Sequence, residues 1–312
     1  MKGFLPTTAI VLLGLLLIQS SLGFGAVYRY QDTHGKWYYS DKKPSKSNTK
    51  KIDTLEFKDH RKMALKPEIS YHHKNGKLFI YATNPLFAPV EFDIRSPLFE
   101  GGKLSVEVEP NSKKNVYSAT ENSGIRPDYN FSFAMGSPEA QHQHDYYLPP
   151  VPSNQSFRIS QSFKGRFSHY REPHIYSVDI AMPVGTTLHA ARGGIVSSTK
   201  DDYHMGGAKE YFLDKANFVK ILHDDGTIAT YAHILLGSLK VKLGDKIATG
   251  QAIARSGSSG YSTGPHLHFV IQRNTGMAYK SVPFKFRQAG MAAYTPKRHM
   301  EVSGQPHAIG IE

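Results

Sequence analysis

Two histidines, separated by one residue, are the side chains in this sequence that are best placed to do chemistry together. His266 and His268 stand in the stretch TGPHLHFVIQ, which has the composition of a β-strand. Alternate side chains of a strand point to the same side, so the two imidazoles converge. The preceding segment 256–265 is rich in glycine and serine, which lets backbone come close to a ligand. The same spacing recurs at His142 and His144 in polar sequence without an acidic partner, so an H-x-H pair alone predicts a site only weakly.

Three other segments strengthen the prediction of a site. Asp179 lies in the strand-like stretch VDIAMPVGT, just before a turn, and His233 ends a strand that begins at Thr227. Segment 243–251, LGDKIATGQ, supplies a turn and a strand that lead into the glycine-rich segment. The chain has no cysteine, which excludes a thiol nucleophile and a cysteine-bound zinc. Any metal must therefore be held by histidine, aspartate or glutamate side chains.

The order of these motifs resembles that of the LytM/lysostaphin-type zinc metallopeptidases, family M23, over about residues 161–272. The family has an Asp followed by A-x-P-x-G-T, then a strand with N-x-V, a Y-x-H, a G-D-x-(V/I)-x-x-G-Q and a G-P-H-L-H. The matching segments here are Asp179 with 181–186, Asn217 to Val219, Tyr231 to His233, Gly244 to Gln251 and Gly264 to His268. Five motifs in the family's order make the resemblance specific.

The resemblance implies one Zn²⁺ per chain, with two histidines and one aspartate as protein ligands. Carried over residue by residue, Asp179 and His268 are zinc ligands, and His233 and His266 are the catalytic pair beside the metal. This assignment agrees with the chemistry of zinc, which takes imidazole and carboxylate ligands and leaves a fourth position for water in catalytic sites. A neighbouring neutral histidine accepts a proton, and a second one stabilises the oxyanion or protonates the leaving amine.

The first zinc ligand departs from the family pattern. The usual H-x3-D spacing would place it at Ile175, which has no donor atom. Two histidines remain: His174 gives H-x4-D, and His169 gives H-x9-D. Several family members carry a G-x-x-S-H before a longer loop that returns through Y-x-(V/I)-D, as Tyr176 to Asp179 does here. We therefore favour His169 as the ligand and keep His174 as the alternative.

Three residues are candidates for lining the substrate groove. Asn217 belongs to the N-x-V motif, which the family places on a strand near the site. Tyr203 and Tyr261 lie in loops that we expect to border the groove.

The N-terminus predicts export. A short positive start is followed by the apolar stretch 10–18, IVLLGLLLI, and then by small residues up to Ala26. This is the pattern of a cleavable signal peptide. The apolar stretch is shorter than the roughly 20 residues that a membrane-spanning helix needs. We therefore expect an exported protein, periplasmic or secreted.

The rest of the chain predicts an all-β protein. Residues 27–44 read as two aromatic strands around a glycine turn and resemble a small module at the start of many exported Gram-negative proteins, and the polar residues 45–66 read as a linker. Short alternating runs between turns predict an antiparallel β-sandwich before the metallopeptidase sheet. The predicted division is a signal peptide at 1–26, the small module and linker at 27–60, a β-sandwich-like domain at 67–150, an M23-like zinc peptidase domain at 156–287 and a loosely ordered polar tail at 288–312.

Charge and export together narrow the function. The chain has 38 basic and 26 acidic residues, a net charge of +12, without a run of five basic residues. An exported protein is not expected to bind nucleic acid. Its positive charge suits a cell-wall polymer that bears free carboxylates. The leading hypothesis is a zinc endopeptidase that cleaves peptide cross-links of peptidoglycan, with a protein regulator as a possible partner. The alternatives are a non-enzymatic LytM-fold regulator or wall-binding protein, and a peptidase that acts on proteins.

Overall fold

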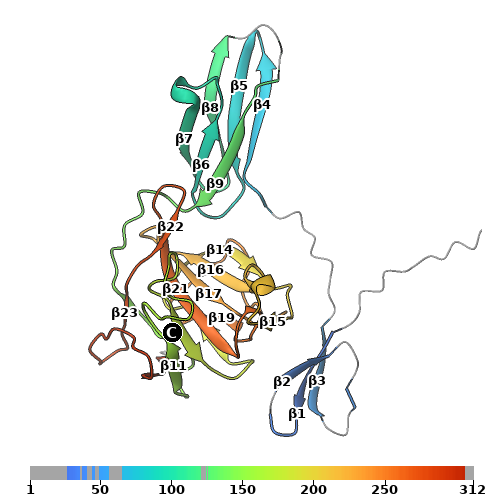
Figure 1. The fold of residues 1–312 in the computed structure, drawn as a ribbon, viewed down its shortest axis with the longest axis vertical. Helices are drawn as coiled ribbons and strands as arrows, with labels where there is room; N and C mark the ends of the chain where they lie inside the picture. Colours follow the sequence, from blue (N-terminus) through green and yellow to red (C-terminus); the bar gives the residue numbers. More distant parts are fainter. Residues whose placement is uncertain are drawn as a thin grey trace, which may run out of the picture.

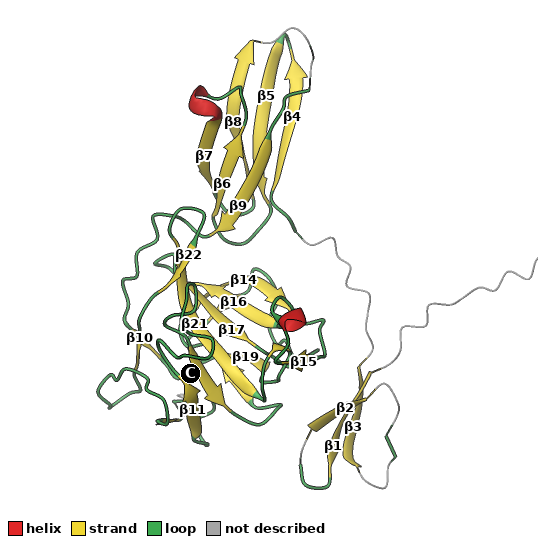
Figure 2. Cartoon of the chain, in the orientation of Figure 1, coloured by secondary structure: helices red, strands yellow, loops and turns green. Residues whose placement is uncertain are grey.

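The computed structural model describes residues 27–35, 37–40, 44–45, 49–55, 65–120, 124 and 126–305. Across these ranges the regular secondary structure is almost entirely β-strand, with two short 3-10 helices (Figure 2). This confirms the predicted all-β class. Within the same ranges, no helix has the length and apolar character that crossing a membrane requires. The predicted signal peptide, residues 1–26, lies outside the described residues.

The first strands form a small three-stranded sheet. Strands β1 (Val27–Asp32) and β2 (Trp37–Ser40) make the predicted hairpin. The linker prediction for 45–66 is wrong over β3 (Thr49–Leu55), which pairs with the other edge of β1. A two-stranded hairpin is marginal in water, and a third strand supplies the missing backbone partners even where its sequence is polar. The ion pair between Arg29 and Asp53 joins β1 to β3.

Two three-stranded antiparallel sheets follow and form the β-sandwich (Figure 1). One sheet has the order β4-β5-β8 and the other β7-β6-β9. Their bounds are Glu68–Lys74 for β4, Lys77–Asn84 for β5, Val90–Arg95 for β6, Lys103–Val108 for β7, Ser112–Thr120 for β8 and Asn130–Met135 for β9; helix η2 spans Glu100–Gly102. The turn between β4 and β5 uses Asn75 and Gly76, both with positive φ, as a tight hairpin requires. The inward-facing residues Leu78, Ile80, Phe92 and Ile94 are almost fully buried.

A nine-stranded sheet is the scaffold of the C-terminal domain. Its order is β18-β14-β16-β17-β21-β12-β11-β24, and β22 pairs with β21. The bounds are Phe157–Gln161 (β11), Val178–Ala181 (β12), Gly194–Lys200 (β14), Phe218–Leu222 (β16), Ile228–Ala232 (β17), Lys246–Ile247 (β18), His266–Asn274 (β21), Tyr279–Ser281 (β22) and Glu301–Val302 (β24). Three short pairs complete the domain: β10 (Tyr146–Tyr147) with β23 (Lys285–Phe286), β13 (Thr187–His189) with β19 (Ala252–Arg255), and β15 (Gly206–Gly207) with β20 (Gly260–Tyr261). Helix η3 spans Glu210–Phe212.

The two faces of this sheet have different roles. Tyr231, Phe269 and Ile271 are fully buried in the main hydrophobic core. Because side chains alternate along a strand, His266 and His268 lie on the opposite face of β21 from Phe269. The core therefore fixes the strands from one side, and the histidines stand on the other.

The polar tail is ordered as far as it is described, contrary to the prediction. Strand β24 pairs with β11, and Val302 is buried in the main core. The Gln288 side-chain amide donates to the backbone carbonyls of Ser303 and Gly304. Burying one apolar side chain and pairing with a free strand edge holds this polar segment in place. Residues 306–312 lie outside the described residues.

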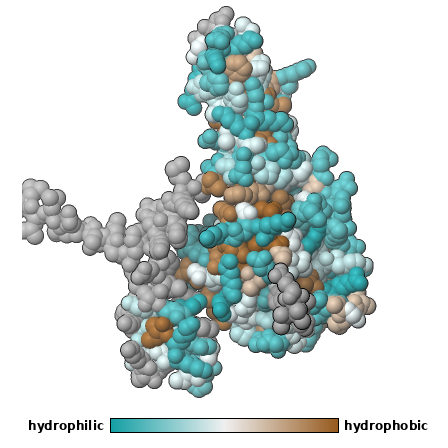
Figure 3. Space-filling model, turned by 180° about the vertical axis from the view of Figure 1, so that it is seen from behind, coloured by the Kyte–Doolittle hydropathy of each residue, from teal (hydrophilic) through white to brown (hydrophobic). Residues whose placement is uncertain are grey.

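The sandwich domain packs against the hairpin formed by β21 and β22. The Glu91 carboxylate, buried in the junction, accepts hydrogen bonds from the Asn274 side chain at 2.7 Å and the Met277 N–H at 2.8 Å. The Tyr279 hydroxyl accepts from the N–H of Met135 and donates to its carbonyl. Seen from behind, hydrophobic residues reach the surface just below the sandwich, whose own surface is mostly hydrophilic (Figure 3).

Candidate metal centre

Three donor atoms from separate parts of the chain converge above the sheet. Antiparallel pairing of β12 with β21 places Asp179 directly opposite His268. His268 Nδ1 lies 2.8 Å from Asp179 Oδ1, and His169 Nε2, from the loop after β11, lies 3.2 Å from the same oxygen. One donor atom of each residue lies within 4.8 Å of the other two. All three residues are buried, His169 completely.

The contacts around these donors fit a metal ligand set. His169 Nδ1 donates to the Ser162 carbonyl at 3.0 Å, which leaves a lone pair on Nε2. That Nε2 is buried and makes no well-formed hydrogen bond. The Gln161 side-chain amide donates to Asp179 Oδ2 at 2.9 Å and orients the carboxylate. Such outer contacts fix the tautomer and direction of the ligands in metal sites. Two imidazoles and a carboxylate are the donor set of a catalytic zinc site.

His233 and His266 stand beside this group. Their ring centroids are 4.6 Å apart, and His266 Nε2 lies 3.8 Å from Asp179 Oδ1. Each ring donates its Nδ1–H to a backbone carbonyl, of Ser259 at 2.7 Å and of Gly264 at 2.8 Å. Both Nε2 atoms are therefore free to accept or donate a proton. His233 has a φ of 63°, a left-handed conformation that is rare outside glycine and often found at functional sites.

His174, the alternative ligand, lies on the far side of His268. Its Nδ1 is 3.2 Å from His268 Nε2, whereas the other ring nitrogen of His268 faces Asp179. The three-donor group thus contains His169 rather than His174.

Burial sets the charge state of these groups. It lowers the pKa of His233 and of His174 to about 3, and it lowers the pKa of His268 against the raising effect of Asp179. Burial by itself raises the pKa of Asp179, but the close imidazoles of His169 and His268 outweigh it and hold that pKa well below the usual range. At neutral pH these histidines are neutral and the carboxylate is ionised, which is the state that binds a divalent cation.

The candidates for lining the groove have different surroundings. Asn217 is fully buried, so its side chain does not line a groove; it donates to the Tyr203 carbonyl at 2.6 Å and accepts from the Tyr203 N–H at 3.0 Å. Asn217 therefore anchors the loop that carries Tyr203, because a buried amide must satisfy its hydrogen bonds locally. Tyr261 is half-buried and stacks on Phe167 with ring centroids 6.1 Å apart.

Sequence reasoning missed Phe167 and Gln161. Phe167 is 56% exposed, two residues before His169 in the same loop. An exposed aromatic next to a candidate ligand was a signal that could have identified it. Gln161 gave no such signal, since its contact with Asp179 follows from the pairing of β11 with β12.

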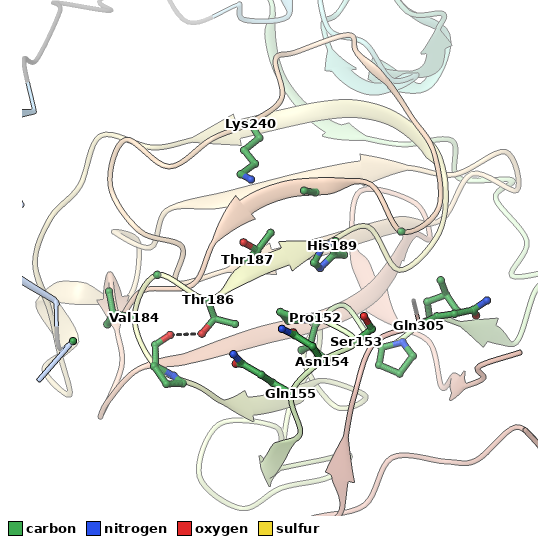
Figure 4. A pocket seen from close by; sticks show the side chains of 18 of the residues that line it. Pro152, Ser153, Asn154, Gln155, Val184, Thr186, Thr187, His189, Lys240 and Gln305 are labelled. Atoms are coloured by element: carbon green, nitrogen blue, oxygen red, sulfur yellow. Dashed lines mark hydrogen bonds between the residues drawn. The ribbon is translucent and has the colours of Figure 1, made fainter. Parts of the chain in front are cut away.

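A cavity of about 780 Å³ lies apart from the histidine group (Figure 4). Thr186, Thr187, His189 and Lys240 are among its lining residues, and none of the five clustered site residues is. The Thr186 hydroxyl donates to the Pro183 carbonyl at its edge. The histidine group and this cavity are therefore separate features of the domain.

An all-β domain that gathers two histidines and an aspartate beside a second histidine pair has the make-up of a metallopeptidase domain. Residues 173–280 match the family model described as Peptidase family M23, and this part of the chain is an M23 domain. The matched range includes Asp179, His233, His266 and His268 and begins just after His169.

Curated relatives match part of the chain. Peptidoglycan DD-endopeptidase ShyA of Vibrio cholerae is 32% identical over 156 residues, 48% of this chain and 32% of that protein. Glycyl-glycine endopeptidase ALE-1 of Staphylococcus capitis is 38% identical over 101 residues, 32% of this chain and 25% of that protein. An uncharacterized metalloprotease of Buchnera aphidicola is 33% identical over 124 residues, 38% of this chain and 30% of that protein. The chain thus spans about a third or less of the length of these relatives.

Similar solved structures include the catalytic domains of an M23 protein and of an antimicrobial peptidase. That of the prophage-encoded protein EnpA from Enterococcus faecalis, solved as a point mutant, is 28% identical, covers 40% of this chain and 87% of that chain, and has a TM-score of 0.31. That of lysostaphin from Staphylococcus simulans is 25% identical, covers 42% of this chain and 94% of that chain, and has a TM-score of 0.28.

Proposed function

We propose that this protein is an exported zinc endopeptidase that hydrolyses peptide cross-links of peptidoglycan. The observation that carries the proposal is the convergence of His169 Nε2, Asp179 Oδ1 and His268 Nδ1 beside a second histidine pair. The similarity to ShyA, a peptidoglycan DD-endopeptidase, and to ALE-1, a glycyl-glycine endopeptidase, supports the substrate class. The net charge of +12 suits a polymer with free carboxylates.

In this proposal the three convergent atoms hold the zinc. When bound, zinc lowers the pKa of a water molecule and polarises the scissile carbonyl. Gln161 keeps the Asp179 carboxylate directed at the metal by donating to its other oxygen. The Ser162 carbonyl keeps the His169 proton on Nδ1, so that Nε2 offers its lone pair.

His233 and His266 carry the proton transfers. Each is fixed through Nδ1, which leaves Nε2 for proton transfer. One imidazole takes the proton that the attacking water loses, and the other stabilises the oxyanion or protonates the leaving amine. No covalent intermediate is needed, which agrees with a chain that has no cysteine. Phe167 and Tyr261, stacked and partly exposed, offer an apolar wall for the peptide.

The decisive experiment combines metal analysis with digestion of purified peptidoglycan by the full chain. We expect one zinc per chain and release of soluble muropeptides from the wild type. We expect His266→Ala to retain the zinc and release none, with His189→Ala, from the separate cavity, as the matched control. A zinc-loaded wild type that binds the wall without releasing products would instead indicate a LytM-fold regulator. Cleavage of a protein such as elastin but not of the wall would indicate the protein-directed peptidase.

A further inference from the structure

We propose that His174 is a positioning residue, which accepts a hydrogen bond from His268 and thereby holds His268 in the tautomer that binds metal. The two rings meet at 3.2 Å between His174 Nδ1 and His268 Nε2, with centroids 5.1 Å apart and planes at 65°. This inference rests on the metal site of the proposed function and is independent of the substrate.

Counting protons on His268 leads to this role. Its Nδ1 faces Asp179 and the donor group, so Nδ1 must keep a lone pair to bind a metal. A neutral imidazole has one ring proton, which then resides on Nε2 and makes that atom a donor. The atom that lies within reach of Nε2 is His174 Nδ1, which must therefore be the acceptor, with the proton of His174 on its own Nε2. The pair has a single consistent arrangement once Nδ1 of His268 is a ligand.

The loop that carries His174 is fastened to the sheet. The Glu172 carboxylate accepts from both the N–H and the hydroxyl of Ser281, each at 2.8 Å. The Gln272 side chain donates to the Pro173 carbonyl at 2.9 Å. Ser281 is on β22. Gln272 is on β21, four residues after His268 and on the same face of the strand. The acceptor and the ligand that it orients are thus held by the same hairpin.

A positioning role differs from both a ligand role and a packing role. A ligand would place a nitrogen within the three-donor group, and the grouped atoms belong to His169, Asp179 and His268 instead. A packing residue would need only its volume. A positioning residue needs an acceptor atom at the place of Nδ1, and it acts on metal affinity without changing the number of metals bound.

The test measures zinc affinity of the full chain by competition with a chromophoric chelator, using three variants of His174. His174→Leu keeps much of the volume and removes the acceptor. His174→Asn places a side-chain oxygen near the position of Nδ1, and His174→Gln places its amide farther out, near Nε2. We expect His174→Leu and His174→Gln to weaken zinc binding about 10- to 100-fold while one zinc per chain is retained. We expect the zinc affinity of His174→Asn to stay within a few-fold of wild type.

Cobalt(II) in place of zinc supplies a second readout. We expect its visible absorption to change in the Leu and Gln variants and to be preserved in the Asn variant. Equal affinities in all three variants overturn the positioning role. Loss of the metal in every His174 variant, with retention in His169→Ala, makes His174 the ligand and overturns it as well. If thermal melting shows that His174→Leu is unfolded, the comparison of His174→Asn with His174→Gln still tests whether an acceptor atom is needed at the place of Nδ1. A wall digestion that fails while these affinities behave as expected rejects only the proposed substrate.

Discussion

At the residue scale, each imidazole of the site has one nitrogen assigned by a contact and one left for chemistry. His169, His233 and His266 donate Nδ1–H to backbone carbonyls, and His268 instead turns Nδ1 toward Asp179. A fixed Nδ1–H leaves Nε2 as the free atom of the first three, whereas Nδ1 is the atom that faces the carboxylate in His268. In the proposed function, these four histidines supply both metal donors and proton carriers without a change of residue type.

His266→Ala tests the separation between holding the metal and moving the proton. Its Nε2 is 3.8 Å from Asp179 Oδ1, and it is outside the three-donor group. We expect hydrolysis to fall about 10²- to 10⁴-fold, the usual effect of removing a general acid or base. Zinc content, measured by elemental analysis, should remain one per chain. Loss of the zinc together with the activity would contradict this division of roles.

His169→Ala tests the ligand set from the other side. We expect it to abolish zinc binding, because it removes one of three protein ligands and opens a buried site. Asp179→Ala should give the same result. Elemental analysis after dialysis is the measurement, and a His169→Ala protein that retains one zinc at wild-type affinity would be incompatible with the proposed site.

Buried neutral histidines make the stability depend on pH. Outside the site, burial lowers the pKa of His223 to about 4, and its Nδ1 donates to the Gly193 carbonyl. Below a pH of about 6.5 the unfolded chain binds a proton that folded His223 does not, so stability falls as the pH falls. His223→Asn keeps a donor near Nδ1 and does not titrate. We expect the loss of unfolding free energy between pH 6.5 and 5.5 to be smaller in this variant by about 1 kcal/mol, measured by urea unfolding. An unchanged pH dependence would contradict the pKa assignment.

At the scale of elements, the register of three strands assembles the site. Asp179 on β12 and Ala232 on β17 both pair with His268 on β21, so the chain leaves β17 at His233 beside the three-donor group. The glycine-rich loop between β19 and β21 then brings the Ser259 carbonyl to His233 Nδ1. One shifted residue in any of these ladders would turn the side chains to the opposite face.

Gly260 is where this loop tolerates no side chain. Its φ is +78°, and an added Cβ would lie 2.5 Å from the backbone of Ala216. We expect Gly260→Ala to lower the unfolding free energy by about 2 kcal/mol or more, through strain and a clash with backbone. Gly264→Ala is the matched control, since its φ is not positive and no atom lies within 4 Å of its added Cβ. Equal melting temperatures for the two variants would count against this account.

At the scale of the whole molecule, hydrogen bonds join the sandwich domain to the β21–β22 hairpin of the C-terminal domain. Glu91 and Met135 of the sandwich bind Asn274, Met277 and Tyr279 of that hairpin. The same hairpin holds the His174 loop through Ser281. These hydrogen bonds of the sandwich thus reach the same hairpin that holds the His174 loop, and none of these residues belongs to the three-donor group.

Tyr279→Phe tests the strength of this junction. The hydroxyl both accepts from and donates to the Met135 backbone, so its loss leaves a buried N–H and carbonyl without their partner. We expect a loss of about 1–3 kcal/mol in unfolding free energy, measured by denaturant titration. Tyr146→Phe, on a side chain that is 49% exposed, is the control and should change it by less than about 0.5 kcal/mol.

The sequence by itself determined the all-β class, the common side of His266 and His268, and the order of motifs that brings Asp179 and His233 into the prediction. These features are local, because side-chain direction along a strand follows from its two-residue period. The roles themselves stay proposals that the metal and digestion experiments address.

Only the tertiary structure decided which loop histidine converges with Asp179, and that Asn217 anchors a loop rather than lining a groove. Spacing cannot choose between His169 and His174, since the path of their loop is set by distant contacts such as that of Glu172 with Ser281. The strands at 49–55 and 301–302 likewise could not be predicted, because their sequences are polar. Each forms because the free edge of a neighbouring strand, β1 or β11, supplies its hydrogen-bond partners. Long-range hydrogen bonding is the physical reason in each case, and it is absent from any local pattern.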